Sequence, residues 1–362
     1  MNSELKFPFY AKVSLIFIGL FAFIYMLDLG QHIIVPIIYS TIIAVLISPM
    51  VQFFIRKRMS RFFAISSSIL LISIVIIALL ILLSTQLSEF TDAFPKLIDK
   101  FYETLNQTII WASENFNIST QKINSFLNDT KTEMISKSRA SIGLTLTTVG
   151  DALVVIVLIP VYVFMILFYE PLLLNFIRKV FGDVHKKKVN EVLGSTKIIV
   201  QKYLIALLME AGIIAILNSI GLYIIGIEYA ILLGLLGAVL NIIPYLGGVI
   251  AMCIYTIVAL VSKNSISYAV YVLILYSIIQ LIDNNFIVPK LVGSKVKINA
   301  LVSIIAVIVG GALWGVPGMF ISLPLTAIIK LIFDHIESLQ PWGYLLGDTM
   351  PPITIFKINL KK

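Results

Sequence analysis

Long apolar runs separated by short charged loops dominate the sequence. The hydrocarbon core of a bilayer is about 30 Å thick, and about 20 helical residues cross it. Six runs come close to this length, and they predict full membrane spans at 12–27, 32–54, 62–83, 146–169, 203–225 and 268–288. Together with two longer runs near the C-terminus, they predict an all-α, polytopic membrane helix bundle with about eight membrane segments.

The two longer runs, 229–262 and 299–333, exceed what one straight span needs. As an unbroken helix each would reach about 50 Å, because an α-helix rises 1.5 Å per residue. Proline removes a backbone donor and glycine permits non-helical angles, so we expect both runs to be broken or re-entrant. The predicted backbone breaks are Pro244, Tyr245, Gly247, Gly248, Pro289, Gly293, Gly311, Gly315 and Gly318.

Basic residues set the expected orientation. The loop between the second and third spans carries Arg56, Lys57, Arg58 and Arg61 without an acidic residue, which predicts a cytoplasmic loop. Both termini are then cytoplasmic. Whether the long runs cross or re-enter stays open. Re-entrant hairpins put the lysines of 290–297 in the cytoplasm, and kinked crossings put them outside.

A polar insertion at 87–145 follows the third span, and we expect it to be an extracytoplasmic helical domain. Its apolar positions recur every three or four residues, as in an amphipathic helix. This stripe suits either an oligomer contact or packing within the chain. The stripe consists of Leu87, Phe90, Phe94, Leu97, Phe101 and Leu105.

A basic segment at 171–202 follows the fourth span, with seven basic and two acidic residues. It predicts a cytoplasmic amphipathic segment, either a linker held near anionic headgroups or a binder of a specific ligand. The expected domain organisation is three N-terminal spans (1–86), the insertion (87–145), the fourth span with the basic segment (146–202), a transport core (203–333) and a cytoplasmic tail (334–362).

Composition excludes most other classes of protein. The 362-residue chain is 59% hydrophobic and 13% charged, with a mean hydropathy of +1.02, which excludes a soluble globular protein. The net charge of +8 fits the cytoplasmic loops of a membrane protein, and we expect no nucleic-acid partner. Cys253 is the only cysteine and no catalytic or nucleotide-binding motif occurs, so we predict no enzyme activity, catalytic residue, cofactor or resident metal.

Polar residues inside the later apolar runs are candidates for a transport pathway. An ionisable group in a span is costly to bury, so it is usually functional or paired. Glu210 and Asn218 lie on roughly one face of the fifth span, because eight residues advance about 800°. Glu210 suits a proton or cation carrier, and it also suits a structural carboxyl paired with Lys202.

A second polar group ends the sixth full span, just before Pro289. Its oxygens suit Na⁺, Li⁺ or a hydroxylated solute, and they also suit the capping of a helix terminus. Asn241 joins this group if the first break packs against it. The candidate pathway residues are Glu210, Asn218, Asn241, Gln280, Asp283, Asn284 and Asn285.

Three motifs carry a family resemblance: Ile243-Pro-Tyr-Leu-Gly247, Asp283-Asn-Asn-Phe-Ile-Val-Pro-Lys-Leu-Val-Gly293, and the glycines and prolines of 311–325. With the layout of nearly the whole chain, they resemble the AI-2E family of autoinducer-2 exporters and PerM-like permeases. The resemblance implies a pentameric permease associated with autoinducer-2 export or Na⁺(Li⁺)/H⁺ antiport. Two positions depart from the family pattern: Gly248 stands where proline is frequent, and Asn299-Ala300 where a His-Pro pair is frequent.

We therefore expect a secondary transporter that exports a small polar solute or exchanges Na⁺ or Li⁺ for H⁺. Irregular backbone survives inside a membrane only where protein or water satisfies it, so paired breaks point to a polar cavity. The alternative is a non-transporting membrane scaffold that binds partners through the insertion at 87–145.

Overall fold

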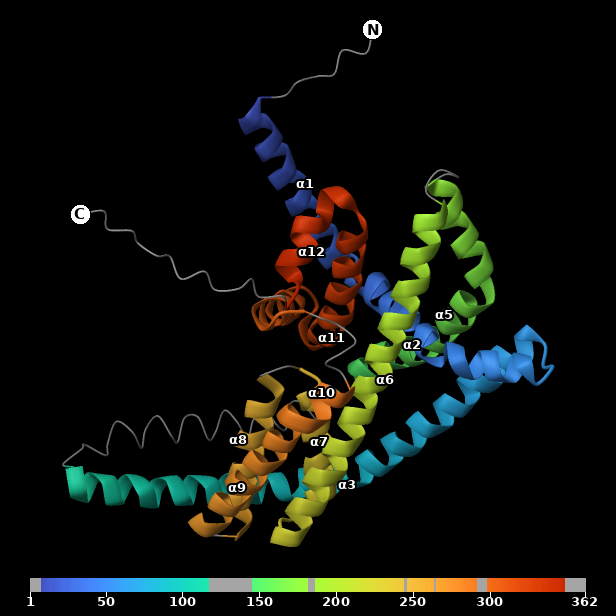
Figure 1. The fold of residues 1–362 in the computed structure, drawn as a ribbon. Helices are drawn as coiled ribbons and strands as arrows, with labels where there is room; N and C mark the ends of the chain where they lie inside the picture. Colours follow the sequence, from blue (N-terminus) through green and yellow to red (C-terminus); the bar gives the residue numbers. More distant parts are fainter. Residues whose placement is uncertain are drawn as a thin grey trace, which may run out of the picture.

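The computed structural model describes residues 8–116, 145–181, 186–243, 246–263, 265–291 and 298–348, and every regular element in these ranges is helical (Figure 1). The elements are α1 (Phe9–Leu29), α2 (Gln31–Arg56), α3 (Arg61–Phe116), α5 (Thr145–Val180), α6 (Lys186–Ile225), α7 (Ala230–Asn241), α8 (Leu246–Lys263), α9 (Ile266–Ile282), the π-helix η2 (Asp283–Ile287), α10 (Val288–Leu291), α11 (Ala300–His335), the 3₁₀-helix η3 (Glu337–Leu339) and α12 (Gln340–Leu346). Within these ranges, 8 helices are long and apolar enough to cross a membrane. The predicted all-α polytopic bundle is thereby confirmed.

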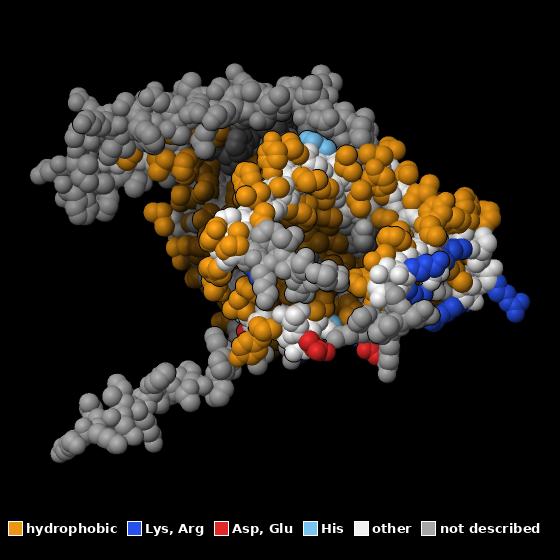
Figure 2. All heavy atoms as spheres, turned by 90° about the horizontal axis from the view of Figure 1, so that it is seen from above, with side chains coloured by type: hydrophobic (Ala, Val, Ile, Leu, Met, Phe, Trp, Pro, Cys, Tyr) orange, Lys and Arg blue, Asp and Glu red, His pale blue; other side chains and the backbone are white. Residues whose placement is uncertain are grey.

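Helix α6 joins two packed groups of helices (Figure 1). Its first half packs through Val200 and Leu204 against α2 and α11, close to the separate core that α2 shares with α3 and α5. Its second half packs through Leu222 against the core of α7, α8 and α9. Seen from above, most of the coloured side chains are hydrophobic (Figure 2), as expected for helices that face lipid on their outer sides.

The first long run folds into two helices, α7 and α8, that pack against each other. The Tyr255 hydroxyl of α8 donates a hydrogen bond to the Leu233 carbonyl of α7 at 2.8 Å. Of the predicted breaks, Pro244 and Tyr245 lie outside the described residues, whereas Gly247 and Gly248 belong to the first turn of α8. The expectation of non-helical angles at these two glycines is wrong, because both are helical. Their lack of a side chain instead allows close approach of neighbouring groups.

Gly247 shows this close approach, since a Cβ atom there would lie 1.6 Å from the Leu240 carbonyl oxygen. Only a residue without a side chain lets the start of α8 approach the end of α7 this closely.

The second long run also doubles back, within α11. Non-helical angles occur at Trp314 (φ −133°, ψ 19°) and Gly315 (φ 61°, ψ −147°), where two helical arms meet. The arms touch at Gly310 and Gly318, because a Cβ on Gly318 would lie 1.9 Å from the Gly310 carbonyl oxygen. Gly315 has a positive φ and lies at the break itself. Gly311 and Gly318 were also predicted to be breaks, but both are helical, and Gly311 faces Met319 of the other arm.

The tip of the α11 hairpin is tied to the N-terminal helices. Trp314 Nε1 donates to the Leu27 carbonyl of α1 at 3.1 Å. The Tyr39 hydroxyl of α2 donates to the Pro317 carbonyl at 2.9 Å. At its base, Asn299 caps the helix by accepting a hydrogen bond from Val302 N at 2.9 Å.

The third span continues into the predicted insertion without a helix end. Helix α3 runs for 56 residues and contains Pro95. The ring of Phe90 lies edge-on to Tyr229 at 5.5 Å between centroids, and Phe90 packs against the core of α7, α8 and α9. At this position the stripe packs within the chain, which favours that alternative over an oligomer contact. Residues 117–144 of the insertion lie outside the described residues.

Candidate transport site

A cluster of buried polar residues lies where α6, α7 and the α9–η2 junction meet. Glu210 comes from α6, Asn241 ends α7, and Asp283 begins the π turn η2, while Asn218 lies buried two turns further along α6 than Glu210. Three of these residues are almost fully buried, with exposed fractions of 9% for Glu210, 3% for Asn218 and 1% for Asp283. The structure therefore brings together polar groups from three separate segments of the sequence.

Asp283 is the centre of this cluster. Its Oδ2 accepts a hydrogen bond from Asn241 Nδ2 at 3.1 Å, while no described residue donates to its buried Oδ1. Helix α6, which carries Glu210, packs against α9 and α10, on either side of the turn that begins at Asp283. A buried carboxylate with an unused acceptor is expensive in a low-dielectric interior, so such groups are commonly retained for function.

Asp283 is the one fully buried residue of the Gln280–Asn285 group, and it begins a π turn. Extra residues in a π turn shift the helical register, and such turns are frequent at functional sites. Asn285 is exposed and donates to the Leu281 carbonyl at 2.8 Å, while Asn284 lies 3.5 Å from Gln280 Nε2. The helix continues from η2 into α10, which contains Pro289. The capping alternative is therefore wrong, and Pro289 does not break the helix.

A second set of polar groups lies around Gly248 and adjoins the cluster through Asn241. A Cβ atom there would lie 2.7 Å from the Tyr276 hydroxyl, 3.6 Å from Gln280 Oε1 and 3.7 Å from Asn241 Oδ1. The Tyr276 hydroxyl in turn donates to Gln280 Oε1 at 2.9 Å. Tyr276 was missed by sequence reasoning, although its position four residues before Gln280 places both on one face of α9.

The structure also reveals a charged group that the sequence did not single out. Glu170, in the second half of α5, pairs with Lys197 of α6 at 2.7 Å and with Arg61 of α3 at 3.3 Å. Glu170 and Lys197 fall in one predicted division (146–202) and Arg61 in another (1–86), but no sequence feature paired them, so only the tertiary structure joins the three. Gly293 lies outside the described residues, as do Lys295 and Lys297. Among the described residues, no group of three or more His, Cys, Asp and Glu side chains could hold a metal ion.

The fold and this cluster define a multi-pass helical membrane protein with carboxylates and amides buried between its helices. The profile of the AI-2E family transporter matches residues 14–338, so the chain belongs to this family, as the resemblance predicted. It is accordingly a membrane transporter.

Similar proteins carry related names. A putative transport protein of Haemophilus influenzae is 27% identical over 332 residues, which cover 88% of this chain and 91% of that protein. The AI-2 transport protein TqsA of Escherichia coli is 28% identical over 324 residues, which cover 88% and 90%. The putative transport protein YrrI of Bacillus subtilis is 29% identical over 154 residues, which cover 42% and 41%.

Proposed function

We propose that this chain is a secondary transporter of the bacterial inner membrane, with both termini cytoplasmic, and that cargo or a coupling ion passes Glu210 and Asp283. The observation that carries the proposal is the buried Asp283 carboxylate with one oxygen unused by the described residues. Asn218 and Asn241 complete the polar lining. Pentamer formation remains an expectation from the family resemblance.

The two carboxylates favour a proton or a small cation as the coupling species. Like charges repel strongly at low dielectric constant, and a proton or Na⁺ near both groups relieves that repulsion. Carboxylate and amide oxygens are also the ligands that hard cations prefer. Binding of H⁺ in exchange for Na⁺ or Li⁺ at one site would then produce antiport without a nucleotide.

The neighbouring groups suit a hydroxylated solute as the exported cargo. Tyr276, Gln280 and Asn241 converge at Gly248 and offer one hydroxyl and two amides for hydrogen bonds. The name of the Escherichia coli relative supports an autoinducer-2-like signal as one candidate for this cargo. Movement of the α11 hairpin against α1 and α2, where Trp314 and Tyr39 now bond, would open the pathway.

Flux into liposomes with imposed ion gradients tests the proposal. The purified protein is expected to exchange Na⁺ or Li⁺ for H⁺, or to move autoinducer-2 down an imposed gradient, and Glu210→Gln or Asp283→Asn should abolish most of this flux. Glu191→Gln is the matched control, because Glu191 lies exposed on the same helix as Glu210.

Equal flux from wild type, both variants and empty vesicles would contradict transport through this cluster. The scaffold alternative predicts that deletion of the insertion at 87–145 removes function and that Asp283→Asn has no effect.

A further inference from the structure

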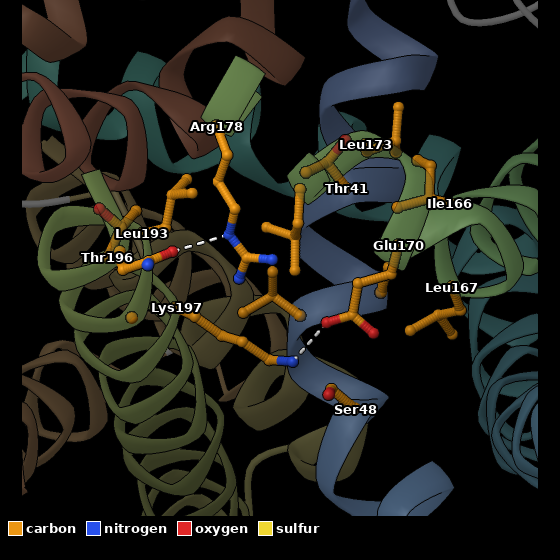
Figure 3. A pocket seen from close by; sticks show the side chains of 15 residues that line it. Thr41, Ser48, Ile166, Leu167, Glu170, Leu173, Arg178, Leu193, Thr196 and Lys197 are labelled. Carbon is orange, nitrogen blue, oxygen red and sulfur yellow. Dashed lines mark hydrogen bonds and ion pairs between the residues drawn. The ribbon is translucent and has the colours of Figure 1, made fainter. Parts of the chain in front are cut away.

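A cavity of about 450 Å³ lies between α2 and the hairpin formed by α5 and α6 (Figure 3). Its size falls within the range of sites that hold small molecules. Most of its wall is aliphatic, with Val45 from α2, Leu173 from α5 and Leu193 from α6. It is separate from the Glu210–Asp283 cluster, none of whose residues line it.

Basic groups exceed acidic groups in this cavity. Figure 3 shows Arg178 and Lys197 extending into it from the two arms of the hairpin, with Glu170 opposite Lys197. Glu170 is shared between Lys197 at 2.7 Å and Arg61 at 3.3 Å. One carboxylate is thus paired with two cationic side chains.

Arg178 adds a third cation and has no carboxylate partner among the described residues. Its Nε donates to Asn190 Oδ1 at 2.7 Å and its Nη1 donates to Asn175 Oδ1 at 3.0 Å. Both acceptors are neutral amides, so they orient the guanidinium without neutralising it. No described residue is bonded to the third guanidinium nitrogen, and a guanidinium N–H donates strongly to an anionic oxygen.

The residues around the α5–α6 hairpin indicate which class of molecule carries this anion. Phe176, Val180 and Phe181 are exposed near the end of α5, which suits contact with lipid. The sequence at the tip is strongly basic, with Lys186–Lys188 opening α6. Basic pockets between membrane helices with apolar walls are suited to the headgroups of anionic lipids.

We propose that this cavity binds an anionic phospholipid, with the phosphate held by Arg178 and Lys197 and the first part of the acyl chains along the aliphatic wall. A free phosphate ion would leave that wall uncovered, whereas a phospholipid matches both the charge and the apolar lining. Sequence analysis left a specific ligand for segment 171–202 open, and the cavity gives that ligand a chemical class and two contact residues.

Equilibrium binding of short-chain phosphatidylglycerol to the purified full chain in neutral detergent tests this inference. Wild type should bind phosphatidylglycerol at least about tenfold more tightly than phosphatidylcholine, and inorganic phosphate should not compete. Arg178→Gln should weaken phosphatidylglycerol binding about tenfold, since it removes one charge-assisted hydrogen bond.

Lys179→Gln is the matched control, because Lys179 is the exposed neighbour of Arg178 and does not line the cavity. It removes the same charge and should change the affinity less than about twofold if the bound phosphate is held by direct contact.

Gly194→Leu keeps the experiment decisive if Arg178→Gln folds poorly. Gly194 lines the cavity, and a Cβ there meets nothing within 4 Å, so a leucine enters open space without losing a charge. Leucine also favours the helix over glycine. This variant should weaken phosphatidylglycerol binding as much as Arg178→Gln does. Equal weakening by Lys179→Gln, equal binding of phosphatidylcholine, unchanged binding in Gly194→Leu, or competition by inorganic phosphate would each overturn the proposal.

Discussion

Asn241 donates a hydrogen bond from Nδ2 to Oδ2 of Asp283 at 3.1 Å, and this contact ties the end of α7 to the π turn after α9. The two residues are 42 positions apart in sequence. Each stands where a regular α-helix is interrupted, since α7 stops at Asn241 and η2 starts at Asp283. The interruption in one long apolar run therefore supplies the partner for a carboxylate in the neighbouring span.

Replacing Asn241 with alanine should destabilise the protein and impair transport. Asp283 would then have neither oxygen bonded by a side chain of the described residues, and an unsatisfied buried polar group costs about 1–3 kcal/mol. Thermal unfolding in detergent and flux in liposomes measure the two effects. Asn285→Ala is the control, because Asn285 is exposed and, among the described residues, bonds only a carbonyl of its own helix. A comparable loss in both variants would contradict a special role for the Asn241–Asp283 contact.

Gly248→Ala should lower transport more than it lowers stability. The added Cβ would come within 2.7 Å of the Tyr276 hydroxyl, at the far end of a side chain that can turn away. That movement would separate Tyr276 from Gln280, whose hydrogen bond is 2.9 Å long. Flux and the midpoint of thermal unfolding should be measured on the same preparation. Normal flux in Gly248→Ala would contradict a role of the Tyr276–Gln280 pair in the pathway.

Gly318→Ala should destabilise the α11 hairpin, because the new Cβ would collide with the Gly310 carbonyl oxygen at 1.9 Å. Overpacking of this kind typically costs about 1–3 kcal/mol. Gly212→Ala on α6 is the matched change, since no atom lies within 4 Å of its Cβ position. It should stabilise the helix by about 0.5–1 kcal/mol. Equal unfolding midpoints for the two variants would show that the arms of α11 are not in close contact.

Glu170→Gln should lower stability in a salt-dependent manner. The change leaves Arg61 and Lys197 facing each other without the carboxylate that now lies between them. Partly exposed ion pairs contribute about 0.2–1 kcal/mol each, and salt screens them. The unfolding midpoint should therefore differ from wild type at low ionic strength and converge with it at high ionic strength. Glu228→Gln, at an exposed position, should show neither effect.

Cysteine labelling tests on which side of the membrane the sixth full span ends. In a Cys253→Ala background, Lys290→Cys and Lys57→Cys both introduce an exposed thiol. If the first long run is re-entrant, both thiols should react with an impermeant maleimide only from the cytoplasmic side. Reaction of Lys290→Cys from the outside, with Lys57→Cys protected, would instead support a kinked crossing of the first run.

Much of the fold followed from local pattern. The six predicted spans all lie in long helices, because apolar length alone decides which segments can cross a bilayer. The positions of the two interruptions were also predicted, near Pro244 and at Gly315. The continuation of α3 past residue 86 was not, because a helix that becomes amphipathic keeps the same backbone while its hydropathy falls.

The candidate site was predicted in part. Burial of Glu210, Asn218 and Asp283 fits the principle that polar groups in spans face the bundle interior. Asn284 and Asn285 were grouped with Asp283 by proximity in sequence, yet both are exposed, since successive residues of a helix point in different directions. Which of the three residues faces the bundle depends on how this helix packs against its neighbours, and the local sequence does not encode that packing.

The sequence by itself determined that this is a multi-pass helical membrane protein with two interrupted apolar runs, since hydrophobic length, proline and glycine act within a few residues of where they stand. Only the tertiary structure decided which polar groups meet: Asn241 with Asp283, and Glu170 with Lys197 and Arg61. These side-chain contacts depend on how helices distant in sequence cross and on the register in which they pack. The packing energy that determines both arises from contacts between helices, which the local sequence does not contain.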